Sequence, residues 1–81
     1  MRVRVLYFAS ARDAAAVGSE SMQLRDGASV NELAAEIMKA HPAFGKLAGS
    51  VRFSINLELV SQRTVLHDAD EVGVLPPVAG G

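Results

Sequence analysis

A capping box at Ser29 fixes the start of the main helix that this sequence indicates. Glu32 follows three positions later, the spacing at which the serine hydroxyl accepts a hydrogen bond from the Glu32 backbone N–H and the glutamate carboxylate accepts one from the Ser29 N–H. Pro42 disfavours helical backbone angles at His41, so the helix is expected to stop near Ala40 or His41. Local chemistry therefore sets both ends of this helix.

The same helix carries an apolar stripe that must be buried. Apolar residues recur at i, i+3, i+4, i+7 and i+8, namely Val30, Leu33, Ala34, Ile37 and Met38. Segments on either side of the helix alternate with the two-residue period of strands, which makes a sheet the candidate partner. The sequence thus predicts a helix packed on one face of a sheet.

Two strands are expected before the helix. Residues 2–8 alternate between a polar and an apolar face, with Arg2 and Arg4 opposite Val3, Val5 and Tyr7. A second strand is expected at residues 19–24, forming a hairpin with the first, and the alanine-rich stretch 9–18 is expected to be a loop or a single helical turn. Asp26-Gly27 then indicates a turn before the helix.

Three more strands are expected after the helix. In residues 51–57 the polar side chains alternate with an apolar set, which predicts a half-buried strand through Val51, Phe53, Ile55 and Leu57. Residues 59–60 indicate a short strand, residues 68–70 a turn, and residues 71–75 the last strand. A short turn at residues 44–47 is expected to close the bottom of the core.

This order of elements predicts an α+β fold of the β-grasp type. A helical crossover between the first hairpin and the later strands requires at least one parallel pairing, with the main helix across one face of a mixed sheet. Residues 1–75 are therefore expected to form one domain. Pro76 and Pro77 cannot continue a central strand, so residues 76–81 are expected to leave it as an extended tail.

Composition argues against several classes of function. The 81 residues contain no apolar run near the roughly 18 residues of a membrane span, and the alternating residues 1–5 do not resemble a secretory signal. We therefore expect a cytoplasmic protein with no membrane partner. Eight basic and nine acidic residues give a net charge of −1, so nucleic acid is not an expected partner either.

The chain offers no arrangement of residues typical of an active site. There is no cysteine, and His41 and His67 are far apart and are interpreted as surface histidines, so no metal site and no catalytic residue are predicted. Asp68, Asp70 and Glu71 form an acidic cluster. A solvated turn is the favoured explanation of that cluster, and a patch facing a partner is the alternative.

Strand parity predicts an apolar patch on the outer face of the sheet. If Arg2, Arg4, Glu71 and Gly73 point away from the helix, the same face receives Leu6, Phe8 and Leu75, and Leu59 can join them. Scattered surface hydrophobes are normal, whereas a contiguous patch beside the origin of the tail would indicate a docking surface. We assign partner docking to Phe8, Leu59 and Leu75.

The tail ends in two residues without side chains. A terminal Gly-Gly arises by chance in about one chain in 200, so it is a weak signal by itself. Two prolines stiffen the preceding segment, and six extended residues span roughly 20 Å, enough to reach into a pocket of a partner. The tail residues are Pro76, Pro77, Val78, Ala79, Gly80 and Gly81.

Several of these segments resemble the small subunits of molybdopterin synthase. The similar segments are residues 5–9 with Arg12-Asp13, residues 54–60, residues 68–72 and the ending Pro-Pro-Val-Ala-Gly-Gly. The ending is the specific part, whereas the helix matches only in pattern. One departure is Ala69, where the family commonly has glycine.

The resemblance implies a sulfur carrier of ubiquitin-like fold. Gly81 would be adenylated with ATP by a ubiquitin-activating-type enzyme and converted to a thiocarboxylate by a sulfur donor enzyme. The loaded tail would enter the large synthase subunit, in a heterotetramer, and deliver sulfur to the cyclic pyranopterin precursor of molybdopterin. Catalytic side chains would belong to that partner, and no cofactor would be bound permanently.

Two other readings of the same features stay open. One is a sulfur carrier for another pathway, such as thiamine synthesis, and the other is a ubiquitin-like modifier conjugated to lysines. The Pro-Pro segment favours the molybdopterin reading, because thiamine carriers are usually shorter and lack it. A binding module that carries nothing is the residual possibility.

Overall fold

The computed structural model describes residues 1–47 and 49–76. The described helices and strands follow one another along the chain. They are β1 (Arg2–Tyr7), α1 (Ala9–Ala15), β2 (Ser19–Gln23), α2 (Val30–Ala40), the 3₁₀ helix η1 (Pro42–Lys46), β3 (Arg52–Ile55), β4 (Glu58–Val60) and β5 (Glu71–Leu75).

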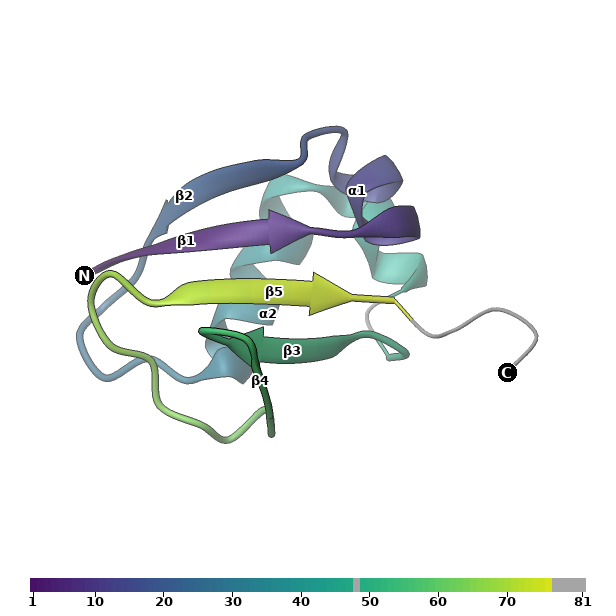
Figure 1. Ribbon diagram of the computed structural model, residues 1–81. Coiled ribbons are helices and arrows are strands. Elements are labelled where there is room, and N and C mark those ends of the chain that lie inside the picture. Colours follow the sequence, from purple (N-terminus) through teal and green to yellow (C-terminus); the bar gives the residue numbers. More distant parts are fainter. Residues whose placement is uncertain (48, 77–81) are drawn as a thin grey trace.

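The strands form one mixed sheet in the spatial order β2-β1-β5-β3-β4. β1 pairs antiparallel with β2 and parallel with β5, and β3 pairs antiparallel with both β5 and β4. Figure 1 shows α2 behind the sheet, so the reader faces the sheet surface that the helix leaves free. The predicted β-grasp fold, with its parallel pairing and its single main helix across one face, is confirmed.

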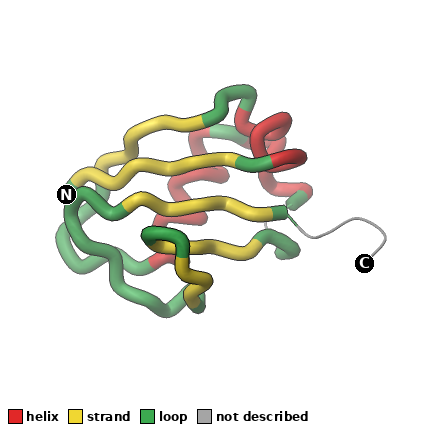
Figure 2. The backbone as a smooth tube through the Cα atoms, in the orientation of Figure 1, coloured by secondary structure: helices red, strands yellow, loops and turns green. Residues whose placement is uncertain are grey.

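The core lies between the sheet and the helices. α2 buries three members of its apolar stripe, Val30, Leu33 and Ile37, while Ala34 is partly buried and Met38 stays 38% exposed. Phe44 of η1 is fully buried, which confirms that this turn closes the core. Figure 2 shows the same two layers, with the strands on the near side and the helices behind them.

The capping box of α2 forms as predicted. The Ser29 backbone N–H donates to Glu32 Oε2 across 2.7 Å, and the Glu32 backbone N–H donates to Ser29 Oγ across 3.3 Å. The helix ends at Ala40, two residues before Pro42. The turn before it places Gly27 at φ +82°, in the left-handed region that glycine enters without a steric penalty.

The segment after β1 is more regular than predicted. We expected a loop or one helical turn, but α1 spans seven residues and buries Ala11 and Ala15 completely or nearly so. Alanine has the highest helix propensity, and its small side chain lets the helix approach its neighbours closely, which explains the second turn. Phe8 precedes α1 in an extended conformation, and Ala9 has φ +47°.

The prediction that Leu57 is a buried strand residue is wrong. β3 ends at Ile55, and Leu57 is 92% exposed. Asn56 and Leu57 have φ values of +49° and +76°, so these two residues form the tight turn that connects β3 to β4. The alternation of the sequence continues through the turn and therefore conceals where the strand ends.

The predicted boundary between domain and tail stays a prediction. β5 ends at Leu75, and Pro76 follows it outside the strand. The remaining tail residues, 77–81, lie outside the described residues. Within residues 1–47 and 49–76, no helix has the length and apolar composition needed to cross a membrane.

Candidate docking face at the C-terminal strand

The sheet face opposite α2 changes from charged to apolar along β1 and β5. Arg4 pairs with Glu71, and two residues further along Leu6 pairs with Gly73. Successive residues of a strand point to opposite faces, and the valines of β1 and β5 are buried in the core, so these four residues share the outer face. The predicted parity of the two strands is confirmed.

Three apolar side chains lie on this outer face, two of them near the end of β5 and the third on β4. Ser54 of β3 pairs with Gly73 on one side and with Leu59 of β4 on the other. Phe8 directly follows β1, and its backbone N–H donates to a carbonyl of β5 across 3.2 Å. Phe8 and Leu59 are exposed and Leu75 is partly buried. We call Phe8, Leu59 and Leu75 the apolar patch; its role in docking stays a prediction.

The tail starts beside this patch. Pro76 directly follows β5, which lies between β1 and β3, and Pro76 is partly buried. Figure 1 shows that β5 and β1 run in the same direction, so the end of β5 lies next to the start of α1. The predicted sulfur attachment point Gly81 and the tail residues Gly80, Ala79, Val78 and Pro77 lie outside the described residues.

A polar cluster that sequence reasoning missed lies beneath the same end of the sheet. Tyr7 Oη donates to Glu20 Oε2 across 2.6 Å, and His41 Nε2 lies 2.6 Å from that same oxygen. The rings of Tyr7 and His41 meet edge to face, with their centroids 5.9 Å apart. Burial is the main cause that raises the pKa of Tyr7, followed by its hydrogen bond to Glu20.

The interpretation of His41 as a surface residue is therefore wrong, because its side chain is 18% exposed. His67, in contrast, is 81% exposed, as expected. The cluster joins the β1–β2 hairpin to the C-terminal end of α2. No spacing in the sequence signals it, since the three residues come from three separate elements.

The acidic turn is explained by its own backbone contacts. Asp68 Oδ1 accepts from the Arg2 backbone N–H and Asp70 Oδ2 accepts from the His67 backbone N–H, each across 2.8 Å. Ala69 N–H donates to the Arg2 carbonyl across 2.8 Å. These bonds fix the turn to β1, which supports the structural explanation over a patch that faces a partner. Ala69 has φ +70°, the reason that glycine suits this position.

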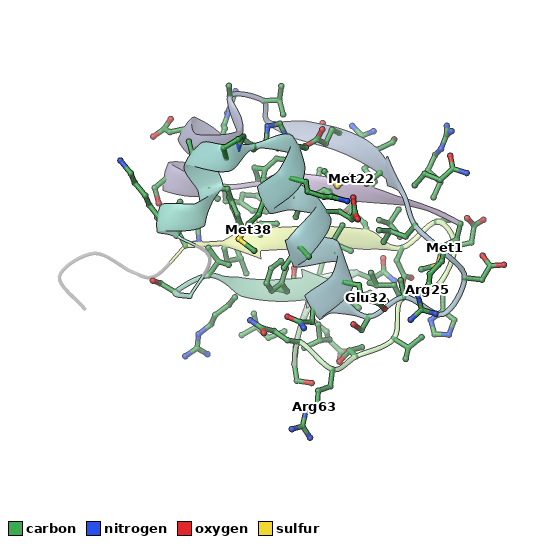
Figure 3. The ribbon with its side chains drawn as sticks, turned by 180° about the vertical axis from the view of Figure 1, so that it is seen from behind. Met1, Met22, Arg25, Glu32, Met38 and Arg63 are labelled. Carbon is green, nitrogen blue, oxygen red and sulfur yellow. The ribbon has the colours of Figure 1, made fainter. Side chains whose placement is uncertain are left out.

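A separate groove lies on the helix side of the molecule. Its volume is about 590 Å³, and its wall includes Leu24, Ala28 and the ion pair between Arg25 and Glu32. The Arg25 guanidinium donates to both carboxylate oxygens, across 2.9 and 2.8 Å. The Ser29 backbone N–H, and next the Arg25 guanidinium, lower the pKa of Glu32. Figure 3 shows this pair at the start of α2.

Metal binding has no support in the described residues. Within residues 1–47 and 49–76, no three histidine, aspartate or glutamate side chains gather closely enough to hold an ion. The outer face, where the apolar patch lies beside the origin of the tail, is the candidate functional site. It supplies an apolar surface of about the kind that proteins use to dock one another.

Comparison with known proteins adds full-length matches. Residues 5–81 match the ThiS family. A molybdopterin synthase sulfur carrier subunit from Chlamydomonas reinhardtii is 40% identical over 83 residues, which cover 100% of both chains. The match therefore extends over the strands, the helices and the C-terminal segment alike.

Solved structures agree with this match. A Pyrococcus furiosus chain assigned as subunit 1 of molybdopterin converting factor superposes with a TM-score of 0.87 and 37% identity, covering 96% of this chain and 99% of that one. A chain from the complex of subunits 1 and 2 of the Helicobacter pylori molybdopterin-converting factor superposes with a TM-score of 0.72 over 100% of both chains. At 24% identity, the second likeness shows the fold alone.

Proposed function

This chain belongs to the ThiS family, and we propose that it is the sulfur carrier subunit of a molybdopterin synthase. Its carrier group would be the carboxyl group of Gly81. The large subunit would supply the catalytic side chains, and this small subunit would deliver sulfur without catalysing the transfer. The full-length similarity to a carrier subunit supports this function over thiamine synthesis and over protein modification.

The observation that carries the proposal is the position of the tail's origin. Pro76 follows the central strand β5, and that strand ends at Leu75, beside Phe8, on the outer face. A partner that covers the apolar patch would therefore lie next to Pro76, where the tail begins. Docking energy from the patch would offset the cost of ordering the tail, roughly 1 to 2 kcal/mol for each residue fixed.

The chemistry requires activation of Gly81. A carboxylate with an ordinary α-carboxyl pKa of about 3.3 to 3.7 is ionised at neutral pH and is a poor electrophile. An activating enzyme would transfer AMP from ATP to the carboxylate and release pyrophosphate. A sulfur nucleophile from a donor enzyme would then displace AMP and leave a thiocarboxylate. The chain has no cysteine, so no side-chain thiol can carry the sulfur instead.

Three partners follow from this scheme. They are the ubiquitin-activating-type enzyme, the sulfur donor enzyme and the large synthase subunit, with which the carrier would assemble as a heterotetramer. The H. pylori chain comes from a complex of two such subunits, which supports a large-subunit partner here. We place these steps in the cytoplasm.

The first experiment measures sulfur loading. The full chain is incubated with ATP, the activating enzyme and the sulfur donor, and intact mass is recorded before and after. We expect one oxygen to be exchanged for one sulfur. A variant lacking Gly81 and a variant with one alanine added after Gly81 should show no exchange; sulfur uptake by either variant would place the attachment point elsewhere.

The second experiment measures delivery. Loaded carrier is titrated against fixed amounts of the pyranopterin precursor and the large subunit, and molybdopterin is quantified. Because a dithiolene contains two sulfur atoms, product should level off near one molecule for every two carriers. Many products per carrier in the absence of ATP would show a catalyst, and transfer of the chain onto lysines would show a modifier.

A further inference from the structure

Gly73 is an unusual residue for its position in the middle of the central strand. Glycine weakens a strand interior, and it is retained there mainly where backbone geometry or a close approach requires it. The φ angle of Gly73 is not in the left-handed region, so backbone geometry does not explain it. Gly73 is nevertheless buried although it lies on the outer face, so other side chains must cover it.

Two side chains cover Gly73. The Cβ atom of any other residue at this position would overlap Ser54 Oγ, the cross-strand neighbour in β3. The same Cβ atom would lie 3.4 Å from Cε2 of Phe8, at van der Waals contact. The Phe8 ring therefore lies over the bare backbone of β5, with Ser54 on the adjoining strand.

The backbone of Phe8 is held in place independently. Its N–H donates to the Val74 carbonyl across 3.2 Å, and its carbonyl accepts from the N–H groups of Ala11 and Arg12 across 3.0 and 3.4 Å. Ala9 turns the chain sharply with φ +47° immediately afterwards. The direction in which the Phe8 side chain leaves the backbone is thus fixed, and the room above Gly73 decides where its ring comes to rest.

We propose that the bare backbone of Gly73 forms a seat that positions the Phe8 ring before any partner binds, with Ser54 merely filling the space beside it. Phe8 then meets the large subunit as a preformed anchor, 45% exposed, instead of a side chain that has to be ordered on binding. Gly73 acts through Phe8 and is a positioning residue. This inference rests on the docking role of the apolar patch in the proposed function.

The test fills the seat while sparing the fold. The double variant S54G/G73V moves the glycine from β5 to β3, removes the overlap with Ser54 and puts two methyl groups under the Phe8 ring. The single variant S54G and the double variant S54G/G73A are matched controls, because a Cβ atom alone only touches the ring. We would measure the affinity for the large subunit and the thermal unfolding of each variant. In the unaltered chain we would also measure the nuclear Overhauser effect between the Phe8 ring protons and the Gly73 α-protons.

We expect S54G and S54G/G73A to bind within about threefold of the unaltered chain. S54G/G73V should lose about 30-fold in affinity, the loss typical of a removed interface anchor, and should keep its cooperative unfolding. The F8A variant should lose as much. Adding S54G/G73V to F8A should cause no further loss, because residues that act through one another are not additive.

The outcomes separate this inference from the proposed function. If F8A binds weakly but S54G/G73V binds normally, the seat is refuted and the docking role of Phe8 stands. If F8A binds normally, both the anchor and its seat are refuted. A further loss when the three substitutions are combined would show that residue 73 contacts the partner directly. Sulfur loading of the unaltered chain and of the variant lacking Gly81, measured by mass, tests the carrier function without altering the apolar patch.

Discussion

Tyr7, the only tyrosine of the chain, donates a hydrogen bond from its hydroxyl group to Glu20 Oε2 across 2.6 Å, a pairing that no pattern in the sequence signals. His41 Nε2 lies 2.6 Å from the same oxygen. The contact ties the first hairpin to the end of α2, directly beneath the start of the apolar patch. It therefore fixes the residue directly before Phe8 to polar groups on the helix side of the sheet.

Replacing Tyr7 by phenylalanine should cost about 1 to 2 kcal/mol of unfolding free energy, because a partly buried carboxylate loses one hydrogen bond while the ring stays in place. Chemical denaturation of the full chain measures this loss. Y7F should keep the edge-to-face contacts with His41 and Phe44. Equal stability of the two proteins would show that solvent replaces the bond at no cost.

The same contact predicts a response to alkaline pH. The pKa of Tyr7 is raised above its ordinary value of 10.0, so the folded state holds the phenol proton more tightly than the unfolded state does. This contribution to stability is complete below pH 10 and falls as the pH rises further, by up to about 1.4 kcal/mol for each pH unit. The difference in unfolding free energy between the unaltered chain and Y7F should therefore shrink above pH 10.

Because there is one tyrosine, absorbance of tyrosinate reports this group alone. We expect no tyrosinate at pH 10 in the folded protein, and its appearance together with the loss of circular dichroism at higher pH. A tyrosinate titration with a midpoint near the ordinary value, in protein that is still folded, would contradict the buried hydrogen bond.

Ala69→Gly should raise the unfolding free energy by about 0.5 to 1 kcal/mol. Ala69 has φ +70°, where its Cβ atom is crowded, and relief of that crowding exceeds the greater entropy of glycine in the unfolded chain. Ala35→Gly on the exposed side of α2 is the matched control and should instead cost about 1 kcal/mol. A loss of stability in both variants would show that Ala69 is not strained.

Leu57→Gly should also stabilise the fold, by about 1 kcal/mol. Leu57 is 92% exposed and has φ +76°, so its replacement loses almost no buried surface and removes strain at the second turn position. Asn56→Gly is the contrasting variant. The Asn56 side chain accepts from the Glu71 backbone N–H across 3.2 Å, so its loss should remove the benefit. Thermal unfolding of both variants measures these effects: L57G should melt at a higher temperature than the unaltered chain, and N56G should not.

Local signals in the sequence predicted most of the fold. The capping box fixed α2, the two-residue period fixed β1 and the faces of the sheet, and Pro76 marked the end of β5. The error at Leu57 arises because alternation reports side-chain preference and does not mark where a strand ends. At α1 the alanine content itself favours the longer helix that the structure shows.

The candidate site could be predicted only in part from such local signals in the sequence. Parity placed Phe8, Leu59 and Leu75 on one face, because strand geometry converts residue number into direction. The sequence could not show that Phe8 lies over Gly73, or that Tyr7 and His41 meet at Glu20, because these contacts join elements far apart along the chain. Such pairs depend on the crossover and on the register of the strands.

The strongest prediction about function concerns the apolar patch. Leu59 is 61% exposed, so Leu59→Ala should leave thermal unfolding nearly unchanged while it weakens binding to the large subunit by about 30-fold, the effect of removing one interface anchor. Leu57→Ala is the matched control, since Leu57 is even more exposed but lies in the turn, beyond the row that runs through Ser54 and Gly73.

Isothermal titration of both variants with the large subunit separates specific docking from general hydrophobicity. If the outer face near Pro76 is the interface, L59A loses affinity and L57A does not, although each removes the same number of methyl groups. Equal losses would mean that any exposed leucine of the hairpin contributes, and a loss confined to L57A would move the interface to the opposite end of β3. Sulfur loading should be measured alongside, because an activating enzyme that docks on the same patch would be weakened by L59A in parallel.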